Sequence, residues 1–212
     1  MNNKISHIAR IITEDPDIFV EATDEEILAR IAARKKREKE EEEQREFEEM
    51  QRLEKEQFEL DNPPIASFKG EYAFLSNFYP SPLVADGITY PTVEHAFQAA
   101  KTNDPQTKSI IAAKDTPGKA KRAGGRRGII KDFDPNWETR KISVMSSLVR
   151  QKFQDPELRE LLNNTGEREL IEGNSWNDTF WGVCRGKGKN NLGKILMQIR
   201  ADLNPAHNHP LP

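Results

Sequence analysis

A carboxylate and an amine share one face of the helix predicted for residues 92–101, within "YPTVEHAFQAAKT" at 90–102. Glu94 and Lys101 are seven residues apart, which places them about 10 Å apart along a helix axis. That separation is too long for a direct ion pair, but it suits the two ends of a polar ligand that carries phosphate. The alternative is a pair of charges that face solvent. Another face of this helix is apolar and is therefore expected to be buried; it consists of Val93, Ala96, Phe97 and Ala100.

Histidines offer weaker candidates for chemistry. His95 can act as a general acid or base, but a single histidine on a helix is more often a hydrogen-bonded structural residue. The tail sequence "HNH" at 207–209 has no cysteine or acidic partners at ligand spacing. We therefore predict no metal site.

The segment "GNSWNDTFWG", residues 173–182, surrounds one acid with indoles and an amide. Aromatic faces suit a flat heterocycle, and an asparagine can hydrogen-bond to its edge. Because Asp178 and Asn177 lie among Trp176 and Trp181 rather than outside them, we favour a ligand site over a tryptophan-packed core loop.

Two basic loops contain glycines: "AKRAGGRRG" at 120–128 and "CRGKGKNN" at 184–191. The second directly precedes a predicted helix, whose free N–H groups favour an anion. Arg126 or Lys187 can therefore meet a phosphate. Neither spacing matches a P-loop or a dinucleotide fingerprint, and flexible solvated loops remain the alternative.

The composition favours a soluble, intracellular (cytoplasmic) protein without a membrane segment. No apolar run approaches the roughly 18 residues that span a bilayer, and "MNNKISHIAR" lacks the apolar stretch of a secretion signal. The single cysteine, Cys184, cannot form an internal disulfide. The net charge of −3 argues against a surface that coats nucleic acid, although a local basic patch is compatible with it.

The amino-acid composition of the chain changes sharply near residue 61. Residues 24–60 are rich in Glu, Lys, Arg and Gln and contain neither Gly nor Pro, and Thr23 and Glu26 have capping-box spacing. We predict a solvated helix held by local ion pairs, with a coiled-coil dimer or partner-docking arm as the alternative. "DNPP" at 61–64 ends this helix. We therefore divide the chain into three predicted regions: a charged helical extension at 1–60, a globular domain at 61–205 and a flexible tail at 206–212.

The globular domain is predicted to be α+β and predominantly helical, with short strands. The segment 65–81 is typical of strand or irregular core-lining chain, Asp86-Gly87 predicts a hairpin, and "ELIEGN" at 169–174 predicts a short strand. Asp134-Pro135 and Asp155-Pro156 each supply an N-cap followed by proline. The expected helices cover 92–101, 105–114, 135–153, 156–165 and 192–203. The helix at 135–153 is expected to bury Ile142, Met145, Leu148, Val149 and Phe153.

Across roughly Phe68 to Leu203 the chain resembles the NADAR family, also called YbiA-like. The resemblance rests on several separated motifs in the right order: "FLSNFYPSP", "YPTVEHAFQAAK", Gly125-Arg126, "NWE" at 136–138, "NDTFWG" and "GKGKNNLGKILMQIR". The charged helix before residue 61 lies outside it.

The resemblance implies hydrolysis of an N-glycosidic bond without a cofactor. Early riboflavin-pathway intermediates, which are phosphoribosylamino-pyrimidines, are the first substrate class that it implies. Relatives that remove ADP-ribose from guanine in nucleic acid imply the second. Glu94 and Asp178 carry over as catalytic acids. The remaining positions are expected to bind substrate: Asn77, Phe78, Lys101, Arg126, Trp137, Trp176, Asn177, Trp181 and Asn190. Trp176 is the position that varies within the family.

Cleavage of an N-glycoside develops positive charge on the ribose, as in glycosidases. We expect Glu94 to stabilise that charge and deprotonate water, with Asp178 holding the ribose or sharing the acid–base work. Lys101 and Arg126 are expected to hold phosphate. Three hypotheses remain: a hydrolase of riboflavin intermediates, an ADP-ribosyl-guanine hydrolase that acts on nucleic acid, and a non-catalytic module that binds ADP-ribose or NAD. The overall acidity of the chain weighs slightly against the second. The charged helix can add self-association or partner docking.

Overall fold

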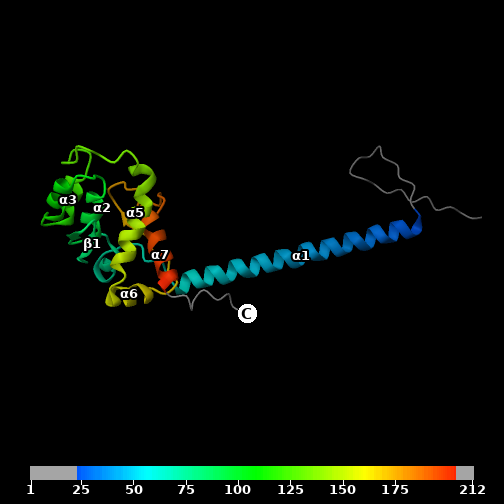
Figure 1. The fold of residues 1–212 in the computed structure, drawn as a ribbon. Coiled ribbons are helices and arrows are strands. Elements are labelled where there is room, and N and C mark those ends of the chain that lie inside the picture. The colour runs from blue at the N-terminus through cyan, green and yellow to red at the C-terminus, as the bar shows by residue number, and fades with distance from the viewer. Residues whose placement is uncertain (1–22, 204–212) are drawn as a thin grey trace, which may run out of the picture. The chain divides into compact units, whose positions relative to one another are not determined.

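The computed structural model describes residues 23–203 (Figure 1). The chain divides into two units, residues 1–60 and residues 61–212. The tail predicted at 206–212, with its "HNH" sequence, lies outside the described residues. None of the described helices is long and apolar enough to cross a membrane.

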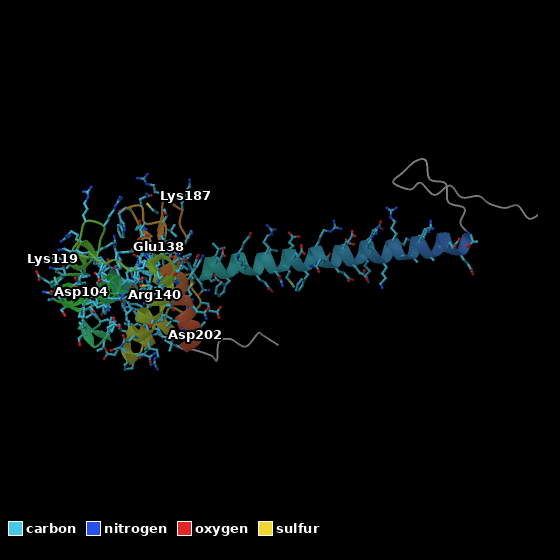
Figure 2. The ribbon with its side chains drawn as sticks, turned by 45° about the horizontal axis from the view of Figure 1, so that its top comes forward. Asp104, Lys119, Glu138, Arg140, Lys187 and Asp202 are labelled. Carbon is cyan, nitrogen blue, oxygen red and sulfur yellow. The ribbon has the colours of Figure 1, made fainter. Side chains whose placement is uncertain are left out.

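The helix α1 (Asp24–Asp61) begins at the predicted capping box. Thr23 N donates to Glu26 Oε2 over 2.8 Å, and Glu26 N donates to Thr23 Oγ1 over 3.4 Å. Ion pairs at i,i+4 spacing follow along the helix, including Arg34–Glu38 at 2.6 Å. Figure 2 shows side chains that project from α1 on every side. The described side chains of α1 are exposed, including the thin apolar stripe of Phe47, Met50 and Leu53.

Residues 61–203 form the α+β domain that the sequence predicts, with helices around two very short sheets (Figure 1). Its elements are the 3₁₀ helix η1 (Gly70–Leu75), the strands β1 (Leu83–Ala85), β2 (Ile88–Tyr90), β3 (Gly173–Asn174) and β4 (Val183–Cys184), and the helices α2 (Val93–Ala99), α3 (Pro105–Ala112), α4 (Pro117–Ala123), α5 (Trp137–Lys152), α6 (Pro156–Asn163) and α7 (Asn191–Leu203).

The predicted hairpin is confirmed. β1 and β2 pair antiparallel with Leu83 opposite Tyr90, and Asp86 and Gly87 adopt φ of 50° and 73° at the turn. Both central residues of a type I′ turn need positive φ, which explains the Asp-Gly pair. The segment "ELIEGN" forms less strand than expected, because Leu170 bridges Ile65 alone and only Gly173–Asn174 pair with β4, in parallel.

The core gathers around α2, whose seven residues are all buried. Neighbouring helices α3, α4 and α5 pack against it. Side chains of α5 and α7 fill the space beyond: Met145, Leu148, Val149, Leu192, Ile195, Leu196 and Ile199. Ile142 was expected in this core, but it is 46% exposed, so that prediction is wrong. It lies at the margin of the apolar stripe of α5, three residues before Met145.

Two helix starts differ from the sequence interpretation. The segment 120–128 was expected to be a loop, but its first part, up to Ala123, belongs to α4, because Thr116 accepts a hydrogen bond from Lys119 N and Pro117 takes the first turn. The helix α5 begins at Trp137 without a side-chain cap, rather than at Asp134-Pro135. Asp134 is buried and instead accepts from Asn136 N over 2.8 Å while pairing with Arg140.

Candidate active site

A cavity of ≈ 370 Å³ lies in the globular domain, and the side chains around it come from segments far apart in the sequence. Four acids, three lysines and three indoles line it, together with smaller polar and apolar groups. The lining includes Asn77, Phe78, Glu94, Phe97, Gln98, Lys101, Lys121, Trp137, Glu138, Lys141, Met145, Glu172, Trp176, Asp178, Phe180 and Trp181.

The helix α2 presents Glu94 and Gln98 to this cavity, and Lys101 lines it from the turn that follows, because α2 ends at Ala99 rather than at the predicted residue 101. Thr92 caps the helix by accepting from His95 N, which orients its first turn. Gln98 Nε2 donates to Glu94 Oε1 over 2.8 Å, and Gln98 Oε1 accepts from Lys101 Nζ over 2.5 Å. The Gln98 amide therefore joins two charges that are too far apart to pair directly. Both residues that helical spacing placed together, Glu94 and Lys101, line one pocket.

Glu94 is a buried carboxyl with 5% exposure. Burial raises its pKa above the ordinary value, while the Gln98 hydrogen bond and the charges of Lys121 and Lys101 oppose that rise. The pKa of Lys101 is lowered, mainly by burial, although Glu94 favours its charged form. Each group thus supports the charged state of the other inside the cavity.

His95 has the structural role that the sequence favoured. Its ring is 1% exposed, with Nδ1 2.8 Å from Thr92 Oγ1 and Nε2 3.0 Å from the Lys114 carbonyl oxygen. Because a carbonyl oxygen only accepts, Nε2 carries the proton and Nδ1 accepts from the Thr92 hydroxyl. Both ring nitrogens are engaged within the fold.

Asp178 lines the cavity from the loop between β3 and β4. Its Oδ1 accepts hydrogen bonds from Phe180 N at 3.2 Å and Trp181 N at 2.9 Å. Asn174 closes the other side of the loop, since its side chain exchanges hydrogen bonds with the Asp178 backbone at 2.8 and 3.0 Å. The loop is therefore braced, and one carboxylate oxygen of Asp178 is used to hold it.

The three indoles that line the cavity differ in their packing and exposure. Trp137 and Trp181 pack against Phe97, with ring centroids 4.9 Å and 5.4 Å away. Trp176, in contrast, is 57% exposed at the cavity. Two of the three predicted indoles thus form a fixed aromatic surface, and the third is open to a ligand.

Asn77 and Phe78 line the cavity from the segment after η1. The backbone oxygen of Asn77 accepts from Glu94 N over 3.0 Å, which joins this segment to the start of α2. Asn77 is buried, and its Oδ1 accepts no hydrogen bond from the described part of the chain. This oxygen is therefore a buried acceptor whose hydrogen-bonding capacity the described chain does not use.

Three predicted binding residues do not line the cavity. Arg126 and Asn177 are exposed outside it. Asn190 is buried, with Oδ1 accepting from Glu172 N at 3.1 Å and Nδ2 donating to the Leu170 oxygen at 2.8 Å, so its side chain braces the segment before β3. The basic group that reaches the cavity from the "AKRAGGRRG" segment is Lys121.

Sequence reasoning missed several lining residues. Lys121 was missed because α4 was interpreted as a loop, and recognition of Thr116-Pro117 as a helix start would have placed it. Glu138, labelled in Figure 2, and Lys141 are an i,i+3 ion pair on α5. Glu172 lies in a segment without periodicity, so no pattern indicated it. Among residues 23–203, no group of three His, Cys, Asp or Glu side chains is arranged to hold a metal ion.

The geometry defines the protein as one with a polar pocket lined by acids, lysines and indoles. Comparison with known proteins then assigns its family: the NADAR domain model matches residues 66–204. The chain belongs to the NADAR domain family, as the motifs indicated.

Three similar proteins illustrate this family. N-glycosidase YbiA of Escherichia coli (strain K12) is 42% identical over 139 residues, which cover 65% of this chain and 85% of that protein. N-glycosidase Npun_R5314 of Nostoc punctiforme is 35% identical over 137 residues, covering 62% and 86%. The chloroplastic riboflavin biosynthesis protein PYRR of Zea mays is 36% identical over 147 residues, covering 62% and 23%.

A solved structure supports the fold. The NMR structure of the E. coli protein YbiA matches with a TM-score of 0.59 at 38% identity, covering 70% of this chain and 88% of that chain. The predicted α+β fold of YbiA type, preceded by a long charged helix, is therefore confirmed.

Proposed function

We propose that this chain is a hydrolase that cleaves the N-glycosidic bond between a (phospho)ribose and a nitrogen heterocycle. The observation that carries the proposal is that Glu94 and Asp178, from distant parts of the sequence, line one cavity with three indoles. Relatives named N-glycosidase and riboflavin biosynthesis protein support the same reaction class. The preferred substrates are phosphoribosylamino-pyrimidine intermediates of riboflavin biosynthesis.

The reaction develops positive charge at C1′ of the ribose. Glu94 stabilises that charge as a carboxylate and takes a proton from the attacking water. Gln98 supports this role, because its amide hydrogen bond holds Glu94 Oε1 and favours the ionised form. Asp178 keeps the loop of Trp181 in place through Oδ1 and faces the ribose.

The remaining lining groups suit the rest of the substrate. Indole faces bind the flat base by stacking. Lys101, Lys121 and Lys141 line the cavity and attract phosphate, with Lys121 and Lys141 taking the role that the sequence gave to Arg126. Asn77 and Phe78 line the cavity beside these groups. Hydrolysis by carboxylates and water uses no metal or redox cofactor.

A second candidate, removal of ADP-ribose from guanine in nucleic acid, is favoured by the distribution of charge. Residues 1–60 contain 18 acidic and 11 basic residues, whereas residues 61–212 contain 17 and 21 and so carry a net charge of +4. A second hollow of ≈ 370 Å³ beside α4 is lined by Lys114, Lys119, Arg122 and Arg127, of which Lys119 is labelled in Figure 2. The overall acidity therefore comes from the N-terminal segment and does not disfavour contact between the globular domain and a strand.

Incubation with both substrate types separates these functions. The full chain is mixed with a phosphoribosylamino-pyrimidine or with an oligonucleotide that carries ADP-ribosyl-guanine, and release of the base or of ADP-ribose is followed. Turnover of the first alone supports the preferred function, and turnover of the second alone supports the alternative. Tight binding of ADP-ribose without any product would support a non-catalytic module.

Variants then test the two acids. Glu94→Gln is expected to lower the rate by about 10²–10⁴-fold, the usual contribution of a general base. Glu160→Gln, an exposed carboxylate on α6, is the matched control and is expected to keep the full rate. An Asp178→Asn variant with an unchanged rate would exclude Asp178 from catalysis.

A further inference from the structure

Glu172 lines the same cavity from the segment just before β3. Its Oε2 is buried and accepts no hydrogen bond from the residues that the structure describes. The other two acids differ, because Glu94 Oε1 accepts from Gln98 and Asp178 Oδ1 accepts from the loop backbone. A buried carboxyl oxygen without a donor favours the protonated acid over the carboxylate, and a protonated carboxyl carries a hydrogen that it can donate.

The backbone at Glu172 is fixed on both sides. Its N–H donates to Asn190 Oδ1 over 3.1 Å, and its carbonyl oxygen accepts from Val183 N over 2.9 Å. Gly182 packs so closely against this backbone that a Cβ at position 182 would lie 2.1 Å from the backbone carbonyl oxygen of Glu172. The Glu172 side chain therefore lines the cavity from a backbone position that is held in place, as a reacting group requires.

Charged groups from three segments act on Glu172: Asp178 from the β3–β4 loop, Lys121 from α4 and Lys69 from the residue before η1. Burial raises the pKa of Glu172 to about 7, and Asp178 adds to the rise, whereas Lys121 and Lys69 oppose it. A carboxyl that titrates near neutral pH can hold a proton in the resting enzyme and release it during the reaction.

We propose that Glu172 is a catalytic residue, the general acid that protonates the nitrogen leaving C1′. This role rests on the proposed function. The C1′–N bond breaks with its electron pair on nitrogen, and the proton of Glu172 joins that nitrogen. The water oxygen bonds to C1′, and the water proton passes to Glu94. The products are the free amino-heterocycle and a ribose with a C1′ hydroxyl, after which Glu94 loses a proton to solvent and Glu172 regains one.

Leaving groups differ in whether they need a proton from a general acid. An amino-heterocycle leaves C1′ as a neutral amine only when it is protonated, whereas 4-nitrophenolate leaves as a stable anion. Loss of the general acid must therefore slow N-glycosides far more than a 4-nitrophenyl riboside.

The experiment compares the full chain with Glu172→Gln on a phosphoribosylamino-pyrimidine and on 4-nitrophenyl ribofuranoside 5-phosphate. We expect the variant to lose about 10²–10⁴-fold in kcat on the N-glycoside and less than about threefold on the nitrophenyl probe. Glu160→Gln, on the exposed face of α6, is expected to match the parent on both. An unchanged N-glycoside rate in Glu172→Gln, or equal losses on both substrates, would overturn the role.

A second measurement needs no variant. In the parent chain, kcat on the N-glycoside is expected to fall as pH rises above about 7, while kcat on the nitrophenyl probe lacks this fall. The same fall on both substrates would contradict the proposal. If the parent releases no base at all, the proposed function itself fails, and the role of Glu172 fails with it. Base release with an unaltered rate in Glu172→Gln would overturn the role alone.

Discussion

Gln98 Nε2 donates a hydrogen bond to Glu94 Oε1 over 2.8 Å, one helical turn away on α2. The same amide accepts from Lys101 Nζ through its oxygen, so its orientation is determined by a carboxylate on one side and an ammonium on the other. The Lys101 ammonium also donates to the Gly124 oxygen over 3.0 Å, which extends the chain to the end of α4. Glu94 is thus held by a network rather than by a single contact.

Replacement of this amide is expected to change the pH dependence of activity. Gln98→Met keeps the shape but removes the hydrogen bond that lowers the pKa of Glu94, so that pKa rises further. Because the ionised carboxylate is required, the acidic limb of kcat/KM for base release moves to higher pH. Gln106→Met, at an exposed site on α3, is the control. An unmoved limb would show that Glu94 ionisation does not govern the reaction.

Gly124 is expected to be essential for this network. A Cβ at position 124 would lie 2.3 Å from Gln98 Oε1 and 2.6 Å from Gln98 Cβ. Gly124→Ala should therefore displace the amide, lower kcat/KM at least tenfold and cost about 1–3 kcal/mol of unfolding free energy by overpacking. Gly118 lies within α4, whereas Gly124 directly follows it, and a Cβ at position 118 meets only Arg122 Nη1 at 3.9 Å. Gly118→Ala should therefore be neutral or stabilising by up to about 1 kcal/mol. Equal thermal denaturation of the two variants would refute the steric argument.

The buried Lys152 is expected to make the free energy of unfolding rise with pH. It is 3% exposed, donates from Nζ to the Ser76 oxygen over 2.8 Å, and burial lowers its pKa to about 7 from 10.5. Between about pH 7 and 10.5 the unfolded chain therefore binds more protons than the folded chain at this site, and the unfolding free energy rises with pH.

Urea denaturation at several pH values measures this dependence. Lys152→Met should gain less stability than the parent over that range, because the titrating group is gone. Lys194→Met, an exposed site on α7, should follow the parent. A parallel pH profile in Lys152→Met would assign the dependence to other groups.

Removal of the N-terminal segment is expected to leave a folded, active domain. A chain that begins at Asp61 keeps Pro63, whose oxygen accepts from Arg168 Nε over 2.7 Å, and Ile65, whose N–H donates to the Glu169 oxygen over 2.8 Å. We expect the same rate of base release and the same denaturation midpoint as for the full chain. Loss of activity would show that α1 contributes to the site.

Sedimentation of the two forms tests self-association. The exposed apolar stripe of α1 is thin, so we expect both forms to sediment as monomers. A dimer of the full chain together with a monomeric domain would support the coiled-coil alternative.

Much of the fold follows from local signals that act within four residues. The capping box at Thr23, the Asp86-Gly87 turn and the Asp155 cap each satisfy backbone groups of their own segment, so the sequence alone predicts them. Ile142 was misassigned because its exposure depends on packing between elements, and Asp134 because it pairs with Arg140, six residues later.

The site was predictable to the extent that residues lie on one element. Helical spacing predicted that Glu94 and Lys101 lie together, and both line the cavity, although α2 ends at Ala99 and Lys101 lies in the turn after it. Glu172 and Asn190 could not be assigned in this way, since their contact joins segments eighteen positions apart through a single amide. Such long-range placement leaves no periodic trace in the sequence.

All three tryptophans of the chain line the cavity. Tryptophan emission, excited selectively over that of the three tyrosines, therefore comes entirely from indoles around one site. Quenching or a wavelength shift on addition of a nucleotide would report occupancy directly, so titrations need neither a label nor turnover.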